Sequence, residues 1–275
     1  MNRRLAAGVL ALACAGCGAG HPSVSQPTVL SSVSASSSTP IVSVPAPSTT
    51  PSSPATISHS ATPSRTVATA VPPVSAAARA AGLLDVRTVV PDAIVDLRYA
   101  TSHNFVGAPL YPADARCLVH QSMAAGLATA AIALRRQGDL LVFWDCYRPH
   151  SVQVRMFQIV PNPDWVARPG PDARSHEAAR SVDVTLARAA TGATCSTDQR
   201  VQGHCLLDMG TGFDDFTPRA YAFASKGVSA LAQANRSRLR LAMNAGGLAV
   251  YSGEWWHFDG PGALVGRPFL NVAVD

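Results

Sequence analysis

From residue 81 onward, hydrophobic positions follow two recurrent patterns, one typical of strands and one typical of helices. Two runs rich in β-branched residues, Leu84–Val90 and Ile94–Tyr99, flank Pro91-Asp92 and predict two strands joined by a turn. The segment Ser122–Gln137 is rich in Ala and Leu, with apolar residues at helical spacing. Gly138 follows it, so we predict a helix that ends there.

The rest of the chain adds further strands and helices in mixed order. We expect strands over Asp139–Trp144 and around Ser181–Leu186, helices over Val152–Ile159 and Ser225–Ala245, and a final hairpin with strands over Leu248–Tyr251 and Trp255–Phe258. Gly246-Gly247 would end the long helix. This mixture predicts the α+β class, in one domain spanning residues 81–275.

The first 80 residues have a different composition. All 17 acidic residues lie beyond them, and residues 18–80 consist mainly of Ser, Pro, Thr, Ala and Val. Such a segment cannot bury enough apolar surface to order itself, so we interpret residues 18–80 as a disordered tether. Four of the 22 basic residues also precede residue 81, which leaves 18 basic and 17 acidic residues in the domain. The domain is therefore nearly neutral, without the basic stripe that nucleic-acid binding requires.

Residues 1–17 have the features of an export signal. Arg3 and Arg4 precede the apolar run Leu5–Ala15, which is too short to span a bilayer. The run ends in Cys14-Ala15-Gly16-Cys17, similar to a bacterial lipoprotein processing site, and Cys17 would then be the lipidated first residue. Cleavage without lipidation, and lipidation at Cys14, are the alternatives. We predict an exported protein, anchored by lipid to the outer face of the cell membrane or its periplasmic side.

The domain itself contains four cysteines, Cys117, Cys146, Cys195 and Cys205. An even number in an exported protein favours disulfides, and four cysteines allow three pairings. We expect Cys195 to pair with Cys205, which closes a short loop, and Cys117 with Cys146. A zinc site built from Cys195, His204 and Cys205 is the alternative, but its spacing matches no structural zinc knuckle.

Two segments carry residues that commonly bind metals. One runs from Ser175 to Asp183 and contains His176, and the other is Glu254-Trp255-Trp256-His257. Three nitrogen or oxygen ligands with one position left for water are typical of a catalytic zinc site. A free carboxylate beside such a site can accept a proton from that water.

Five ordered blocks of this chain together resemble the zinc D-alanyl-D-alanine dipeptidases of the VanX type. They are Asp96–Thr101 with Asn104, Phe105, Gly107 and Tyr111; Trp144–Pro149; Ser175-His176 with Asp183–Leu186; Asp208–Asp214; and Glu254–His257. The resemblance spans almost the whole domain. It implies a small α+β domain with an antiparallel sheet and flanking helices, shared with lysostaphin-type enzymes, DD-carboxypeptidases and the hedgehog signalling domain.

The resemblance also implies roles for individual residues. His176, Asp183 and His257 would bind one Zn²⁺, and Glu254 would be the general base. Arg148 would stabilise the oxyanion, although an ion pair with Asp145 is an alternative role for it. Ser175 and Asp214 match positions that hold the two charged ends of a short substrate. The implied activity is hydrolysis of D-alanyl-D-alanine in cell-wall metabolism.

Several positions depart from the family pattern. Glu177-Ala178-Ala179 replaces Ser-Arg-Gly, Arg174 stands where a substrate-contacting serine is expected, and Cys146 replaces a glycine. The altered pocket wall leaves a second activity open, that of a DD-carboxypeptidase or endopeptidase acting on longer peptidoglycan peptides. A third hypothesis is a zinc-binding or wall-binding lipoprotein without turnover. Glu254 and Arg148 argue against it, because a binding protein needs no base beside its metal.

Overall fold

The structure is a computed structural model that describes residues 70–275, except 191 and 193. The expected signal segment 1–17, its Cys17 and nearly all of the expected tether lie outside the described residues. The described residues belong to one compact unit. Within them, no helix combines the length and the apolar character needed to cross a membrane.

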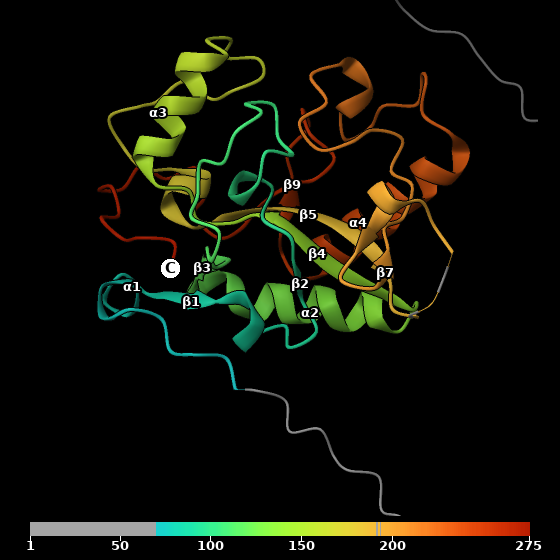
Figure 1. Cartoon of the computed structure of the whole chain (residues 1–275), viewed down its shortest axis with the longest axis horizontal. Coiled ribbons are helices and arrows are strands. Elements are labelled where there is room, and N and C mark those ends of the chain that lie inside the picture. The colour runs from blue at the N-terminus through green and yellow to red at the C-terminus, as the bar shows by residue number, and fades with distance from the viewer. Residues whose placement is uncertain (1–69, 191, 193) are drawn as a thin grey trace, which may run out of the picture. The chain divides into compact units, whose positions relative to one another are not determined.

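A five-stranded sheet in the order β2-β4-β5-β9-β8 forms the centre of this unit (Figure 1). Its strands are β2 Ile94–Val95, β4 Asp139–Asp145, β5 Ser181–Arg188, β8 Ala249–Val250 and β9 His257–Asp259. All neighbouring pairs are antiparallel except β2 and β4, which are parallel. Nearly every residue of β4 and β5 is buried, as is typical of strands covered on both faces.

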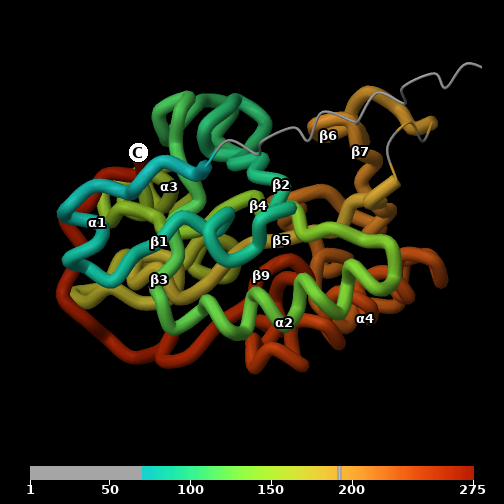
Figure 2. The backbone as a smooth tube through the Cα atoms, turned by 90° about the horizontal axis from the view of Figure 1, so that it is seen from below, coloured from blue at the N-terminus to red at the C-terminus, as the bar shows by residue number. Residues whose placement is uncertain are grey.

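Two small sheets and four helices complete the unit. The small sheets pair β1 Leu83–Asp85 with β3 Leu118–His120, and β6 Arg200–Val201 with β7 His204–Cys205. The helices are α1 Ala76–Ala80, α2 Ala124–Arg135, α3 His150–Ile159 and α4 Ala230–Ala245. Helices α2 and α4 pack against each other and lie together at the lower side of the view in Figure 2, whereas α3 lies above the central sheet in Figure 1. The α+β class is therefore confirmed.

Alternation along β5 separates the core from the opposite face of the sheet. Val182, Val184 and Leu186 point to one face and are fully buried in the hydrophobic core. Asp183 points to the other face. The polar face of the central sheet is thus available for chemistry, while the apolar face packs toward the helices.

Helices α2 and α4 approach each other closely at two glycines. A Cβ atom on Gly126 would lie 2.4 Å from the carbonyl oxygen of Gly246, and one on Gly246 would lie 2.2 Å from the carbonyl oxygen of Gly126. Neither position accepts a side chain without separating the helices. Gly246 therefore has a packing role as well as the predicted role of ending α4.

Several predicted element boundaries were wrong, for local reasons. The expected strand over Leu84–Val90 is β1 followed by a 3₁₀ turn at Val86–Thr88, which the Asp85 side chain caps. The expected strand over Ile94–Tyr99 stops at Val95 and is followed by a 3₁₀ turn at Arg98–Ala100. β-Branched composition identified these segments but not the 3₁₀ turns that end them, of which only the first has a side-chain cap.

The predicted long helix and final hairpin also begin later than expected. Helix α4 starts at Ala230 rather than Ser225, because the Ser229 side chain accepts a hydrogen bond from the backbone N–H of Ala232. Strand β9 starts at His257, so Trp255 and Trp256 precede it and are buried in the core. At the other end of the chain, helix α1 and buried Val74 show that order begins before residue 81.

Both expected disulfides are present. Cys117 is bonded to Cys146, and Cys195 to Cys205, with Cα–Cα distances of 5.2 and 5.9 Å. The alternative zinc site is therefore excluded, because Cys195 and Cys205 are bonded to each other and offer no thiolate.

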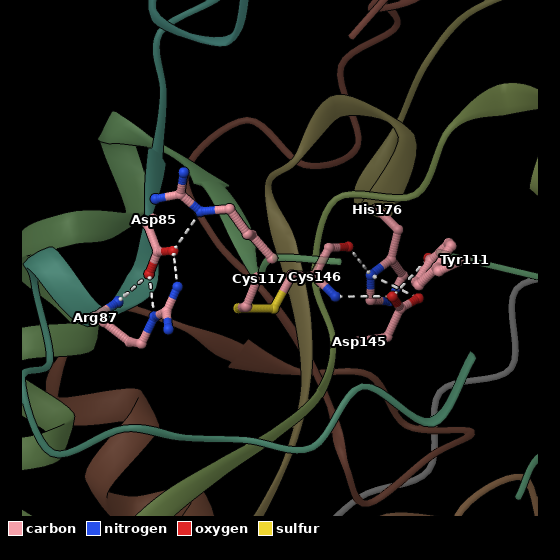
Figure 3. Close-up of a disulfide and its surroundings, with 8 residues drawn as sticks. Asp85, Arg87, Tyr111, Cys117, Asp145, Cys146 and His176 are labelled. Carbon is pink, nitrogen blue, oxygen red and sulfur yellow. Dashed lines mark hydrogen bonds and ion pairs between the residues drawn. A yellow bond between two sulfur atoms is a disulfide. The ribbon is translucent and has the colours of Figure 1, made fainter. Parts of the chain in front are cut away.

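A buried ion cluster lies beside the first disulfide (Figure 3). The carboxylate of Asp85 is fully buried, and it accepts hydrogen bonds from the guanidinium groups of Arg87 and Arg116. Arg116 also donates to the carbonyl oxygens of Pro72 and Pro73, which ties down the start of the domain. Burial alone would raise the pKa of Asp85, but the hydrogen bonds from the two arginines outweigh it and lower that pKa below 3.8.

The Asp85 cluster yields a stability prediction. We expect Asp85→Asn to lower the free energy of unfolding by about 2 kcal/mol at pH 7, because two arginines lose their shared anion. The native contribution is present above the unfolded pKa and is lost as the pH falls through the lower, folded pKa. Urea titrations of both proteins should therefore show a constant difference from pH 7 to about pH 5 that shrinks below pH 4. A difference that grows in acid would contradict this assignment.

Candidate metal centre and active site

The strand register places three polar residues in a row across the sheet. Asp183 of β5 lies opposite His257 of β9 on one side and opposite Asp145 of β4 on the other. A register irregularity between Phe143 and Asp145 brings Asp145 to the same face as Asp183. Three segments far apart in sequence thus contribute to one point on the polar face.

His176 reaches this point from a 3₁₀ turn, Ser175–Ala178, just before β5. Two residues that bracket the histidine have positive φ angles, 49° at Ser175 and 55° at Ala179. Such angles cost about 1 kcal/mol for residues other than glycine. The left-handed conformation at Ala179 occurs where the resembling family has glycine, so this chain keeps the backbone bend despite the added methyl group.

Donor atoms of His176, Asp183 and His257 converge to form the candidate metal centre. His176 Nε2 lies 3.1 Å from His257 Nδ1 and 3.3 Å from Asp183 Oδ1. His257 Nδ1 lies 3.1 Å from the same Asp183 oxygen. A tetrahedral site with metal–ligand bonds of about 2.0 Å separates its ligand atoms by about 3.3 Å. The three side chains therefore fit a zinc-sized ion, and they could hold a metal.

The hydrogen bonds behind the two histidines also fit metal binding. His176 Nδ1 lies 2.8 Å from the carbonyl oxygen of Cys146, which can only accept, so this nitrogen carries the proton and Nε2 keeps its lone pair. His257 Nε2 lies 3.0 Å from Asp259 Oδ1, and Ser181 donates to the same oxygen. Metal-binding histidines are commonly oriented by such partners on the nitrogen that faces away from the ion.

The centre attracts positive charge. Burial alone would lower the pKa of His257, but hydrogen bonds to Asp183 and Asp259 outweigh it and raise that pKa to about 10. Burial alone would also raise the pKa of Asp183, but His176 and His257 outweigh it and hold that pKa well below its ordinary range. A bound proton is thus strongly retained among these carboxylates, and a metal cation could take its place.

Glu254 lies beside the candidate centre, in the connection between β8 and β9. One of its carboxylate oxygens is 3.8 Å from His257 Nδ1, and its side chain is 26% exposed. Burial raises the pKa of Glu254 to about 7. This carboxylate is close enough to the centre to exchange a proton with a molecule held there.

Arg148 is held rigidly on the same side of the sheet. Its Nε and Nη2 atoms donate to Asp145 at 2.9 and 2.7 Å, and Nη1 donates to Gln153 at 2.7 Å. Nη2 also lies 3.9 Å from the Asp183 carboxylate. The expected alternative, an ion pair with Asp145, is thus present, but the guanidinium is largely buried and lines the cavity.

Asp214 is an acid on the cavity wall that neither the sheet nor a helix carries. Both of its carboxylate oxygens face the hydroxyl of Tyr99, at 3.2 and 3.0 Å, and its φ angle is 55°. Burial and the nearby Asp183 and Glu254 raise the pKa of Asp214 well above its usual range. Arg236 holds the loop on either side of this aspartate by donating to three backbone carbonyls.

These groups line one cavity of about 530 Å³, a volume within the range of small-molecule sites. Its wall also contains Arg168, Arg174 and Ser175. The Ser175 hydroxyl donates to Ser181 and lies 3.4 Å from His257 Nε2, so it belongs to the network behind the metal centre. All seven site residues expected from the sequence, namely Arg148, Ser175, His176, Asp183, Asp214, Glu254 and His257, line this cavity.

Sequence reasoning missed other residues of the site. Asp259 carried a usable signal, because it is two residues after His257 and so shares its face of a strand. Trp165 and Phe216 carried none. Their rings stack with centroids 5.4 Å apart, and they come from two irregular loops whose meeting no periodicity predicts.

Comparison with known proteins extends the geometric result. The Peptidase M15 family, described as D-ala-D-ala dipeptidase, matches residues 79–275. The chain is 33% identical to a D-alanyl-D-alanine dipeptidase of Escherichia coli K12 over 181 residues, which are 66% of this chain and 86% of the relative. It is 29% identical to the Enterococcus faecium protein of the same name over 204 residues, covering 66% and 90% of the two chains.

A third relative, a D-alanyl-D-alanine dipeptidase of Streptomyces coelicolor, is 30% identical over 182 residues, which cover 59% of this chain and 83% of that one. The family match includes every residue of the candidate centre and the whole cavity wall. The chain therefore belongs to the Peptidase M15 family of D-ala-D-ala dipeptidases and is a peptidase of that family.

Proposed function

We propose that this chain is a zinc-dependent dipeptidase that hydrolyses D-alanyl-D-alanine to two D-alanines in cell-wall peptide metabolism. One observation carries the proposal: three donor atoms of His176, Asp183 and His257 lie 3.1–3.3 Å apart, with the carboxylate of Glu254 beside them. The names of the three relatives support the choice of substrate.

The metal set and Glu254 have complementary roles in this proposal. When bound, zinc polarises the scissile carbonyl and lowers the pKa of a water molecule. Glu254 accepts a proton from the attacking water and delivers it to the leaving amine. Its position next to the centre and its tendency to hold a proton near neutral pH suit both steps.

Arg148 stabilises the negative charge that develops on the carbonyl oxygen. Asp145 and Gln153 accept hydrogen bonds from all three nitrogen atoms of its guanidinium, so the group is held in a constant orientation. A donor that is already oriented needs no rearrangement when charge develops, which is why such groups are effective in catalysis.

Two residues of the cavity wall, Asp214 and Arg174, suit the two charges of a free dipeptide. Asp214 is buried and destabilised as an anion, so an ammonium group of the substrate relieves its charge. For the carboxylate, we propose Arg174 in place of Ser175, whose hydroxyl is engaged with Ser181. Arg174 has one hydrogen bond in the described structure, to the carbonyl oxygen of Leu264, and no ion pair. Arg168 is a weaker candidate, because its guanidinium lies over the ring of Phe157.

We also propose that the protein is exported and anchored through a lipid on Cys17. The sequence of residues 1–17 motivates this, and the two disulfides of the domain support an oxidising compartment.

Glu254→Gln should abolish turnover without loss of the metal. We expect kcat for D-alanyl-D-alanine to fall by about 10³-fold, because the amide cannot move the proton. Metal analysis should still find one zinc per chain in this variant. His257→Ala is the reference that should lose both zinc and activity. Full activity of Glu254→Gln would rule out its role as base, and a wild-type protein without zinc or turnover would refute the proposal as a whole.

Arg174→Ala should weaken the recognition of the substrate carboxylate. For the free dipeptide we expect kcat/KM to fall about tenfold, a modest loss because the arginine is exposed. For the dipeptide with a C-terminal amide the variant and wild type should differ little. Arg168→Ala tests the weaker candidate of the same wall and should lose less than Arg174→Ala on the free dipeptide. Equal losses on acid and amide would show that Arg174 acts on the fold rather than on the carboxylate.

Cys17→Ser should release the protein from the membrane. In a bacterium that processes lipoproteins, we expect the wild type in the membrane fraction and the variant in the soluble exported fraction. Cys14→Ser should leave the wild-type distribution unchanged. If Cys14→Ser causes the release instead, lipidation occurs at the other cysteine, and release in neither variant argues against an anchor at this site.

A further inference from the structure

The four residues Asp145–Arg148 hold His176 by two backbone contacts. The carbonyl oxygen of Cys146 accepts from His176 Nδ1 at 2.8 Å, and the backbone N–H of Arg148 donates to the carbonyl oxygen of His176 at 3.1 Å. The ring and the backbone of this candidate zinc ligand therefore both depend on where the segment 145–148 lies.

The same segment sets the position of the Arg148 guanidinium. Asp145 accepts both the Nε and Nη2 hydrogen bonds of Arg148, and it also accepts from Tyr111 and from the backbone N–H of Cys146. A shift of this segment would consequently displace a metal ligand and the oxyanion donor together.

The Cys117–Cys146 disulfide ties this segment to a second, rigid part of the domain (Figure 3). Cys117 directly precedes β3 and directly follows Arg116, whose guanidinium bonds to the buried carboxylate of Asp85. The backbone N–H of Tyr147 donates to the carbonyl oxygen of Leu118, so the two segments are also hydrogen-bonded beside the disulfide. Both cysteines are 1% exposed.

We propose that the Cys117–Cys146 disulfide is a positioning element of the active site, which fixes the Cys146 carbonyl against His176 and thereby sets the affinity for zinc. This inference rests on the proposed zinc site. Cys146 stands between Asp145 and Tyr147, at the position where the resembling family has a glycine. Breaking the disulfide frees the main chain on which both backbone contacts to His176 depend.

The chain contains a matched control for this role. The Cys195–Cys205 disulfide lies at the β6–β7 hairpin, and neither of its cysteines is among the residues that line the cavity in the described structure. Loss of either disulfide removes a cross-link, but only the Cys117–Cys146 disulfide includes a cysteine whose carbonyl oxygen is hydrogen-bonded to His176.

The test compares two double variants, Cys117→Ala/Cys146→Ala and Cys195→Ala/Cys205→Ala, with wild type. The zinc dissociation constant is measured by competition with a chromophoric chelator, at a temperature where circular dichroism shows all three proteins folded. We expect the first pair of substitutions to raise the dissociation constant 10- to 100-fold, the range typical of lost support behind a metal ligand. The second pair should leave it within about twofold.

The cobalt(II) absorption spectrum gives a readout that a general loss of stability does not change. We expect the visible bands to shift in the first variant and to match wild type in the second. Equal changes in both variants, or unchanged zinc affinity in the first, would overturn the proposal. A wild-type protein that binds no zinc would instead refute the proposed function, so the two failures are distinguishable.

If the first variant does not fold, reduction of the folded protein provides the measurement. In Cys195→Ala/Cys205→Ala, a phosphine reductant can act only on Cys117–Cys146 among residues 70–275 as described. Zinc transfer to the chelator should then be at least tenfold faster after reduction than before, in line with the weaker support of the ligand. An unchanged rate, with reduction verified by thiol labelling, would overturn the proposal.

Discussion

The carboxylate of Asp145 is fully buried at the end of β4, and four hydrogen bonds converge on it. A buried carboxylate costs several kcal/mol in lost hydration, and it is tolerated only when its oxygens are fully hydrogen-bonded. Tyr111, the backbone of Cys146 and the guanidinium of Arg148 meet this requirement. Because these same contacts hold the Arg148 guanidinium and the backbone beside His176, the stability of the end of β4 and the geometry of the candidate site depend on the same residues.

Most of the strained backbone conformations in the described structure lie at or beside the candidate site. Of the four non-glycine residues with positive φ in the described structure, Ser175, Ala179 and Asp214 lie in the cavity wall or beside a candidate zinc ligand. Each such conformation costs about 1 kcal/mol and persists only where surrounding contacts enforce it. The backbone N–H of Ser175 donates to the carbonyl oxygen of Ala263, and the backbone N–H of Arg148 donates to that of His176. Arg236 holds the loop that contains Asp214 by donating to the carbonyl oxygen of Met209.

The sequence predicted the centre of the site better than its surroundings, for a physical reason. His176, Asp183, Glu254 and His257 lie in two short motifs that the sequence shows directly. Strand pairing then places Asp183 opposite His257, and the turn before β5 and the connection before β9 bring His176 and Glu254 to the same point. The start of α4 was missed because a single serine cap decides it, and helical periodicity extends across that cap. The aromatic wall of Trp165 and Phe216 was missed because loop-to-loop contacts depend on the tertiary fold alone.

Under the proposed function, the two ends of the substrate are recognised with unequal strength. Asp214 is buried beside Asp183 and Glu254, where charges interact in a low dielectric, whereas Arg174 is exposed at the cavity wall and screened by water. An ammonium group next to Asp214 therefore contributes more to binding than a carboxylate next to Arg174. A longer wall peptide keeps its terminal carboxylate but has an uncharged amide where the dipeptide has its ammonium group, so it offers Asp214 no cation. The burial of Asp214 thus favours a dipeptidase over a carboxypeptidase, even though the cavity is large enough for small ligands of many kinds.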